Sequence, residues 1–246
     1  MKIGLICGSG FEDPEILKDQ KEIQIDTQYG KASILSGNIN NIETLIISRH
    51  GKTHQLSPLQ VNNRANIKAF AQEKVTHIIA TTACGSLKQE IKRGDFIILD
   101  QFIDFTRFRK NTFADSFEKK IVHTSMAKPF DEQLRQKIYK TAKELKLDVH
   151  GKGCVVTIEG PRFSTIAESK MFRIWRADVI NMSTAPEAML ANEASIPYAA
   201  IAMSTDYDSW KEDEMPVTWK EIETVFKKNA DNVKQLLIKI ISNFKK

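Results

Sequence analysis

Two aspartates separated by a single residue close a small, apolar stretch of the chain, AIAMSTDYD at residues 200–208. Buried strands rarely end in two carboxylates, so Asp206 and Asp208 are the first candidates for chemistry. A carboxyl group at the end of an apolar strand is desolvated, which raises its pKa and lets it hold a proton near neutral pH. The same pair could instead bind Mg²⁺. The residue types therefore indicate either a proton donor or a pair of metal ligands.

A second group of residues has the chemistry of an anion site. Arg49 and His50 end the apolar stretch ETLIISRH. The guanidinium fork suits phosphate oxygens and the neighbouring histidine can donate to the same anion, although Arg49 in a surface ion pair is the alternative. His50 and His54 also have the spacing of metal ligands on a helix, but Gly51 and the strand context argue against a helix here. We expect an oxyanion rather than a metal at this position.

Two further stretches place small residues after an apolar run. Gly8-Ser9-Gly10 offers backbone N–H groups and a hydroxyl to one phosphate, and a plain tight turn is the alternative. It lacks the third glycine of a dinucleotide fingerprint and the Gly-Lys-Ser/Thr of a Walker loop. TTACGS at 81–86 predicts close approach of the backbone to a ligand. Cys84 within it has no His/Asn partner motif, so we interpret it as a small buried thiol rather than a nucleophile.

These residues are positioned by alternating strand-like and helix-like segments. Apolar runs closed by small residues predict strands at 2–7, 43–50, 76–85, 95–106, 152–160, 177–183 and 198–206. Helical patterns predict one helix from the cap Ser57 and first residue Pro58 to about Lys74, and others at 130–146, 165–175, 186–195 and 217–244. Pro186 would open the fourth of these, with Ser183 or Thr184 nearby as a cap or anion donor. The alternation indicates an α/β fold on a central, largely parallel sheet, as a single domain over residues 1–246.

The ends of the predicted strands explain how one site could form. Ligands of open α/β sheets lie beyond the carboxyl ends of strands. Five predicted strands end in the residues that could do chemistry, namely 8–10, 49–51, 81–85, 181–183 and 205–208. TIEGPRFS at 157–164 adds Phe163, an aromatic that could stack on a flat base or pack in the core. Convergence of these ends at one edge of the sheet predicts a single site.

Composition excludes several classes of protein. The 246 residues have 41% hydrophobic and 27% charged members, which is ordinary for a globular chain. The formal charge of +5 comes from lysines spread along the sequence, so we expect solvated faces and no nucleic-acid partner. Three widely spaced cysteines predict no disulfide framework, and the N-terminus does not have the pattern of a signal peptide. No apolar run is long enough to span a membrane. The expected location is the cytoplasm.

In order and spacing, CGSG, SRHG, TTACGS, TIEGPRFS, VINMS followed by APE, and STDYD resemble the methylthioadenosine phosphorylases. These belong to the trimeric branch of the purine nucleoside phosphorylase superfamily. The resemblance runs from Ile3 to the last predicted helix and includes ILDQFID at 98–104. It implies an α/β sandwich with a central mixed sheet flanked by helices, a homotrimer with sites near the subunit interfaces, inorganic phosphate as co-substrate, and neither cofactor nor metal.

The resemblance also implies roles for individual residues. It assigns phosphate binding to Ser9, Arg49, His50, Thr82, Ala83 and Ser183. It places Met182 against the ribose, Phe163 on the base, and Asp206 and Asp208 at the purine edge, with His123 reaching a neighbour's site. Ser164 and Trp219 are the implied specificity positions. This sequence departs from the family pattern in side-chain size at three positions. Ser9 and Ser183 stand where the family often has threonine, and Trp219 stands where the family generally has a small apolar residue.

The implied reaction is phosphorolysis of S-methyl-5′-thioadenosine to adenine and 5-methylthioribose 1-phosphate, with Asp206 as proton donor to N7. A phosphorylase acting on adenosine or on 6-oxopurine nucleosides is the alternative within the class. From other classes, a non-catalytic nucleotide-binding module and a metal-dependent phosphatase using the Asp206–Asp208 pair remain open. A nucleotide-binding module would need no proton donor beside an anion site. A metal-dependent phosphatase would lose its activity when a chelator removes the metal.

Overall fold

The computed structural model covers residues 1–246 and describes all of them except residues 9–15, 119–120, 215–217 and 246. In the described part of the chain, eleven strands form one sheet, with the path β2-β3-β4-β1-β5-β10-β9-β7; off this path, β11 pairs with β5, β6 with β11 and β8 with β6. The strands are β1 (Lys2–Cys7), β2 (Lys18–Thr27), β3 (Gly30–Ile39), β4 (Ile42–Ser48), β5 (His77–Ser86), β6 (Phe96–Ile98), β7 (Gln101–Phe105), β8 (Val149–His150), β9 (Cys154–Ile158), β10 (Val179–Asn181) and β11 (Tyr198–Tyr207). The helices are α1 (Asn63–Gln72), α2 (Glu132–Glu144), α3 (Ile166–Ile174), α4 (Thr184–Glu193) and α5 (Trp219–Ser242), followed by the short 3₁₀ helix η1 (Asn243–Lys245).

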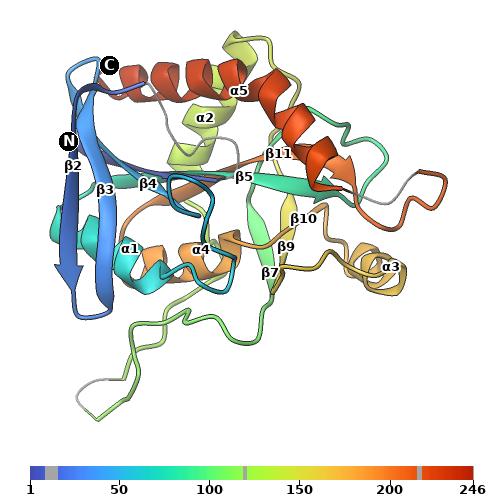
Figure 1. Ribbon diagram of the computed structural model, residues 1–246, viewed down its shortest axis with the longest axis horizontal. Coiled ribbons are helices and arrows are strands. Elements are labelled where there is room, and N and C mark those ends of the chain that lie inside the picture. The colour runs from blue at the N-terminus through green and yellow to red at the C-terminus, as the bar shows by residue number, and fades with distance from the viewer. Residues whose placement is uncertain (9–15, 119–120, 215–217, 246) are drawn as a thin grey trace.

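Helices cover both faces of the sheet, which confirms the expected fold class. Figure 1 shows α2 and α5 above the sheet, α1 and α4 below it, and α3 beside β9 and β10. The long apolar face of α5 packs with α2 on one core cluster, which includes Leu236, Leu237 and Ile240. A second cluster on the other face includes Phe70 of α1 and Leu190 of α4. Burial of these two apolar layers is the main stabilising contribution to the sandwich.

The sheet is mixed, and its two directions meet at β5. Strands β4, β1 and β11 run parallel to β5, whereas β10 pairs antiparallel with it through Val179–Ser86 and Ile180–Gly85. Strands β9 and β7 then continue parallel to β10. The alternation of elements alone predicted a largely parallel sheet, whereas the mixed sheet implied by the family resemblance is the one that the structure shows. Because β10 is antiparallel to β5, the residues that follow β10 lie alongside β5 and approach Thr82. They do not emerge at the edge of the sheet where the strands parallel to β5 end.

The strand hairpin β2–β3 has no counterpart among the predicted elements. Its two strands pair antiparallel, with Thr27 opposite Gly30 beside the turn, and β3 pairs with β4 so that the hairpin forms the edge of the sheet. Its first strand is mostly exposed, with Ile23 and Ile25 alternating with polar residues. That alternation is the signal by which the hairpin could have been predicted.

Two predicted helix starts are wrong, each for a local reason. Residues 57–60 close a turn in which the Gln60 N–H donates to the Ser57 carbonyl at 2.9 Å, and proline is equally suited to the second position of such a turn. Helix α1 begins only after Asn62, whose side chain caps the Ala65 N–H at 3.1 Å. Helix α4 begins at Thr184, earlier than predicted. Pro186 is accommodated in its first turn, where the missing N–H would have no intrahelical partner.

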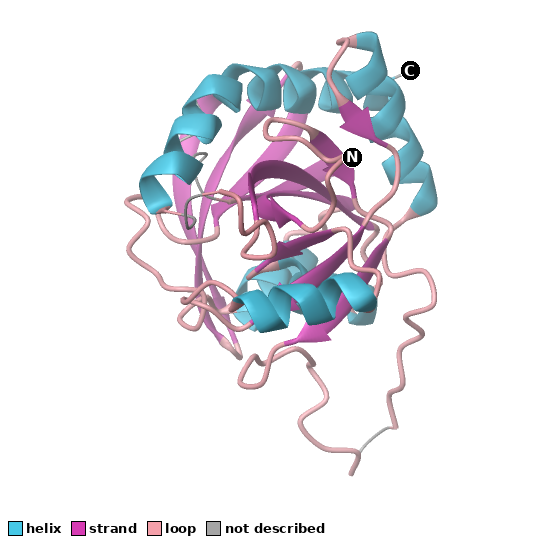
Figure 2. Ribbon diagram, turned by 90° about the vertical axis from the view of Figure 1, so that its right-hand side faces the viewer, coloured by secondary structure: helices cyan, strands magenta, loops and turns pink. Residues whose placement is uncertain are grey.

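No helix in the described part of the chain is both long and apolar enough to cross a lipid bilayer. The segment between β7 and α2 projects away from the body, below α4 in Figure 1, and the second view in Figure 2 agrees. Its described start is held at the base by Glu159, whose carboxylate accepts from the Phe108 N–H at 3.1 Å and from Arg109 Nε at 2.7 Å. The projecting segment carries His123, which is exposed.

Candidate active site

One cavity of about 450 Å³ lies where the two strand directions meet. Its lining contains nine of the eleven residues assigned phosphate or nucleoside roles from the sequence: Arg49, His50, Thr82, Ala83, Phe163, Met182, Ser183, Asp206 and Asp208. Both predicted specificity residues, Ser164 and Trp219, line it as well. The volume is in the range that encloses a small organic ligand. Residues separated by more than a hundred positions in sequence are thus brought to one place.

Two of the assigned residues stand apart from this group. Ser9 lies outside the described residues. His123 is not among the residues that line the cavity, and its ring instead meets Phe117 edge-on at 5.3 Å between centroids. Its predicted role concerns a neighbouring subunit's site, so a single chain does not test it.

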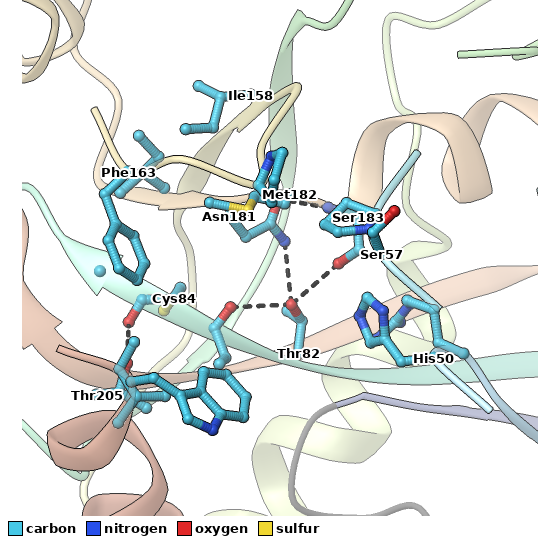
Figure 3. A pocket seen from close by; sticks show the side chains of 18 of the residues that line it. His50, Ser57, Thr82, Cys84, Ile158, Phe163, Asn181, Met182, Ser183 and Thr205 are labelled. Carbon is cyan, nitrogen blue, oxygen red and sulfur yellow. Dashed lines mark hydrogen bonds between the residues drawn. The ribbon is translucent and has the colours of Figure 1, made fainter. Parts of the chain in front are cut away.

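Hydroxyl and amide groups form a connected cluster on one side of the cavity. Figure 3 shows Thr82, Ser183 and His50 on this side, with Phe163, Cys84 and Thr205 across from them. The Thr82 and Ser183 hydroxyl oxygens are 3.1 Å apart, and Asn181 Nδ2 donates to the Thr82 hydroxyl at 3.2 Å. Ser183 precedes α4 without capping it through its side chain, so its hydroxyl faces Thr82 instead. The antiparallel run of β10 along β5 is what brings these two hydroxyls together.

Arg49 enters the same side of the cavity already paired with a carboxylate. Only 2% of its surface is exposed, and its Nε and Nη2 donate to the two carboxylate oxygens of Glu187, the latter at 3.1 Å. Arg49 Nη1 donates to the Thr81 carbonyl at 2.9 Å, and the Tyr198 hydroxyl donates to Glu187 at 2.8 Å. The guanidinium is therefore fixed in orientation by a buried network. The sequence marked Glu187 only as part of a helix start and gave no sign of this pairing.

His50 is held by the backbone of the next loop. Its Nδ1 lies 2.9 Å from the Leu56 carbonyl oxygen, and its ring stacks on that of His54 at 4.6 Å between centroids. Burial, followed by the adjacent Arg49 charge, lowers the pKa of His50 to about 4. The imidazole is therefore neutral at physiological pH. The turn that supplies these contacts contributes His54, Leu56 and Pro58 to the cavity lining, and Ser57-Pro58 within it is the pair that the sequence analysis interpreted as a helix start.

A bulge in β11 aims the first of the two aspartates into the cavity. Ser204 pairs with Cys84 and Asp206 with Gly85, so Thr205 is the extra residue. The Thr205 hydroxyl donates to Asp206 Oδ1 at 2.6 Å, while Oδ2 lies so near Gly85 that a Cβ there would approach it to 2.9 Å. Such a bulge re-aims a side chain without breaking the sheet, and glycine leaves room for the carboxylate.

Burial raises the pKa of Asp206 to about 7, against the opposing hydrogen bond from Thr205 and with a contribution from Asp208. The carboxyl group is therefore poised to hold a proton near neutrality, as expected from the end of an apolar strand. Asp208 is 3% exposed and its pKa is raised by burial, while the Ser164 hydroxyl donates to its Oδ2. The two carboxyl groups thus have different hydrogen-bond partners, Thr205 for Asp206 and Ser164 for Asp208.

Two alternatives raised by the sequence find no support in these contacts. Burial and the nearby Asp206 raise the pKa of Cys84 well above its usual value, so its thiol stays protonated and is a poor nucleophile. Among the described residues, no group of three or more His, Cys, Asp and Glu side chains is arranged to hold a metal ion. Each aspartate of the pair instead accepts from a hydroxyl, Thr205 or Ser164.

Comparison with known proteins agrees with this architecture. The sequence profile of the phosphorylase superfamily matches residues 2–242. The chain is 49% identical to S-methyl-5′-thioadenosine phosphorylase of Xenopus tropicalis, over 98% of this chain and 88% of that protein. It is 46% identical to the enzyme of the same name from Hyperthermus butylicus, over 97% of this chain and 87% of that protein. A solved methylthioadenosine phosphorylase from Schistosoma mansoni, in complex with adenine, superposes with a TM-score of 0.95 at 36% identity, covering 100% of this chain and 92% of that one.

The fold is that of a nucleoside phosphorylase. The chain belongs to the phosphorylase superfamily and, within it, to the family of the S-methyl-5′-thioadenosine phosphorylases. The resemblance inferred from the short motifs is thereby confirmed.

Proposed function

We propose that this chain catalyses phosphorolysis of S-methyl-5′-thioadenosine, releasing adenine and 5-methylthioribose 1-phosphate. The observation that carries the proposal is the juxtaposition, in one cavity, of an anion-binding cluster around Arg49 and a buried carboxyl group, Asp206, that holds a proton near neutral pH. Family membership supports the same reaction, because the relatives bear this activity in their names.

On the anion side, the proposed roles follow from the donors. Arg49, with the Thr82 and Ser183 hydroxyls and the backbone at Ala83, would hold phosphate beneath the anomeric carbon, and the Ser9 hydroxyl is a further proposed phosphate ligand. As the glycosidic bond stretches, positive charge develops on the sugar. A bound phosphate stabilises that charge and then forms the new C–O bond.

On the purine side, negative charge develops on the leaving base, and a proton from Asp206 to N7 neutralises it. Asp208 would accept from the 6-amino group. The Ser164 hydroxyl, which donates to Asp208 Oδ2, stabilises the ionised form needed for that contact. Phe163 is 39% exposed at the cavity and is available to stack on the base, with Met182 against the ribose.

A second candidate substrate is adenosine, and Trp219 is the observation that favours it. The indole lines the cavity, is 49% exposed and lies 5.0 Å from the His54 ring between centroids. Its bulk narrows the region proposed for the 5′ group, which suits a hydroxyl better than a methylthio group. A 6-oxopurine nucleoside is less favoured, because an ionised Asp208 would face a carbonyl oxygen.

The proposal is tested by a substrate panel with purified protein. Methylthioadenosine, adenosine and inosine are each incubated with and without inorganic phosphate, and the released base is quantified by chromatography. We expect phosphate-dependent adenine release from methylthioadenosine, at least about tenfold faster than base release from inosine. Base release that ignores phosphate would identify a nucleosidase, and binding without release would identify a nucleotide-binding module.

We further propose that residues 1–246 act as one phosphorylase domain, that the working assembly is a homotrimer, and that reaction requires no cofactor besides the co-substrate phosphate. Solved relatives are described in complex with adenine and with tubercidin, which supports a purine nucleoside as the ligand of this cavity. A cytoplasmic location stays a prediction from the sequence.

A further inference from the structure

Asn181 lies in the anion subsite, the side of the cavity that holds Arg49, Thr82 and Ser183, and the proposed reaction gives it no role. It is the last residue of β10, it lines the cavity and it is 6% exposed. Its register partner on β9 is Thr157, which is fully buried and is not part of the cavity lining. Together these two side chains connect the start of α4 to the Thr82 hydroxyl.

The backbone N–H of Ala185 sets the direction of the first two hydrogen bonds. Ala185 lies in the first turn of α4, where N–H groups have no partner within the helix, and it donates to the Thr157 hydroxyl at 3.1 Å. The Thr157 hydroxyl in turn donates to Asn181 Oδ1 at 2.8 Å. The Ser183 N–H, which also can only donate, lies 3.4 Å from the same oxygen. The amide therefore keeps its oxygen toward these donors and its NH₂ group toward Thr82.

The hydrogen-bonding capacity of the Asn181 amide is used entirely within the protein. An amide has two N–H donors and one oxygen with two lone pairs. The oxygen accepts from the Thr157 hydroxyl and the Ser183 N–H. The two N–H groups donate to the hydroxyls of Thr82, at 3.2 Å, and Thr184. Figure 3 shows the amide nitrogen directed at the Thr82 hydroxyl. Asn181 thus lines the cavity with nothing left to offer a ligand directly.

The Thr82 hydroxyl receives one hydrogen from Asn181 and has one of its own to give. That hydrogen goes to the Ala83 carbonyl at 2.9 Å, so Ser183 is the donor in its 3.1 Å contact with Thr82. A phosphate oxygen is a stronger acceptor than a neutral carbonyl, and a hydroxyl that accepts a hydrogen bond is itself a better donor. When phosphate is bound, the Thr82 hydrogen therefore turns from Ala83 to the anion.

We propose that Asn181 and Thr157 are positioning residues for phosphate, which direct the hydrogen of the Thr82 hydroxyl at the bound oxyanion without touching it themselves. The relay runs from the Ala185 N–H through Thr157 and Asn181 to Thr82, and each group donates to the next. A reversed amide would take the Thr82 hydrogen for its own oxygen, and the anion would lose this donor. The inference rests on the proposed function only for phosphate as the ligand.

Removal of the Thr157 hydroxyl tests the relay, because T157V nearly keeps the size of the side chain and leaves the cavity lining intact. Affinity for inorganic phosphate is measured by calorimetry on the intact protein, and KM for phosphate and for methylthioadenosine by the rate of adenine release. We expect T157V to weaken phosphate binding by about five- to tenfold and to change KM for methylthioadenosine by less than about twofold. T157S keeps the hydroxyl and should recover phosphate affinity to within about twofold of the unaltered protein.

A double-mutant cycle with T82V separates the relay from a general effect on packing. T82V removes the final donor and should weaken phosphate binding by about ten- to a hundredfold. If Thr157 acts through Thr82, adding T157V to T82V should weaken binding by less than about a further twofold. Independent packing effects would instead multiply, and a multiplicative loss would overturn the inference.

The matched control is T141V, which also removes a hydroxyl from a buried threonine. The Thr141 hydroxyl donates to the Lys137 carbonyl at 2.8 Å and accepts from Asn243 at 3.4 Å, but it lies on α2 and outside the cavity lining. Phosphate affinity should be unchanged in T141V, and melting temperatures report the structural cost in both variants. An equal loss of affinity in T141V, or unchanged affinity in T157V, would contradict the role of Thr157.

Neutron diffraction on the unaltered protein with bound phosphate makes the same test without any substitution. We expect a deuterium on Thr82 Oγ1 directed at a phosphate oxygen and a deuterium of the Asn181 amide directed at Thr82. A Thr82 deuterium still directed at the Ala83 carbonyl, or an Asn181 oxygen facing Thr82, would overturn the inference.

Adenine release separates this inference from the proposed function. If adenine release requires phosphate but T157V binds phosphate normally, only the inference fails. If phosphate binds through the relay and no adenine is released, only the proposed phosphorolysis fails. If phosphate neither binds nor supports adenine release, both fail together.

Discussion

Asp206 and Asp208 are two residues apart but lie in different chemical surroundings. Asp206 follows the bulge at Thr205 and sits against Gly85, whereas Asp208 accepts from Ser164. Burial is the largest cause of the raised pKa of both; it takes the pKa of Asp206 to about 7 and also raises that of Asp208. Two carboxyl groups in different surroundings can take the separate roles of acid and acceptor in one site.

At this scale we predict that D206N lowers kcat by about 10²–10³-fold, because the amide cannot give a proton to N7. Phosphate affinity should change little, since Asp206 is held by Thr205, which lies across from Thr82, Ser183 and His50 (Figure 3). In the unaltered enzyme, kcat at saturating phosphate should be constant below about pH 7 and fall above it, since a general acid with pKa about 7 loses its proton there.

The measurement is the pH profile of kcat for both proteins, together with calorimetric phosphate affinity. D206N should show no descending limb attributable to this group. A loss of phosphate affinity comparable to the loss of turnover would instead mean that Asp206 supports the fold of the cavity.

At the scale of elements, the start of α5 decides what stands at the proposed 5′ end. Thr218 caps the helix, and its hydroxyl and the Glu221 side chain form a reciprocal capping box. This fixes the first residue, Trp219, at the cavity rim, one turn before the buried Ile222, which also lines the cavity. A helix N-terminus held by side-chain hydrogen bonds is a firm support for a specificity residue.

We therefore predict that W219V raises the ratio of kcat/KM for methylthioadenosine over adenosine, by about tenfold, because valine frees apolar volume for the thioether. The capping box is untouched, so the melting temperature should move little. Rates with methylthioadenosine, adenosine and a longer 5′-alkylthio analogue provide the measurement. L59V, which changes an exposed apolar residue not found in the cavity lining, is the control. An unchanged or lower ratio would mean that Trp219 does not contact the 5′ group.

At the scale of the whole molecule, the cavity depends on the meeting of two strand directions, whereas the described parts of the segment between β7 and α2 project from the body of the molecule (Figure 1). This segment exposes Phe108, whose surface is 77% accessible. A projecting segment with an exposed aromatic side chain is suited to contact a second copy of the chain. Such a contact would bring His123 to a neighbour's site, as the family resemblance implies.

We predict a solution mass close to three times the chain mass of 27.9 kDa, measured by light scattering after gel filtration. We also predict that H123A and D206N, each impaired alone, regain activity when mixed after subunit exchange. A mixed trimer contains sites that combine an intact Asp206 with an intact His123 from the neighbour. A monomer, or a trimer without complementation, would contradict this arrangement.

The sequence by itself determined the residue chemistry and most of the elements. Short apolar runs ending in small or charged residues marked β1, β4, β5, β9, β10 and β11, because local hydrophobic pattern and turn chemistry suffice for that. The same local information predicted the raised pKa of Asp206, since burial at a strand end is readable from its apolar neighbours. Nine of the residues that the motifs assigned to the site do line the cavity.

Tertiary structure alone decided the rest, because it depends on contacts between distant segments. The antiparallel docking of β10 on β5 follows from packing, and it determines that Ser183 meets Thr82. The pairing of Arg49 with Glu187 spans 138 positions, and no local pattern encodes it. His50 Nδ1 must donate to the Leu56 carbonyl oxygen, which can only accept, so this one contact sets the tautomer of the ring. Every residue has a backbone carbonyl, so the sequence does not show which of them will meet His50. The charge and hydrogen-bond polarity of the anion subsite are therefore properties of the folded chain.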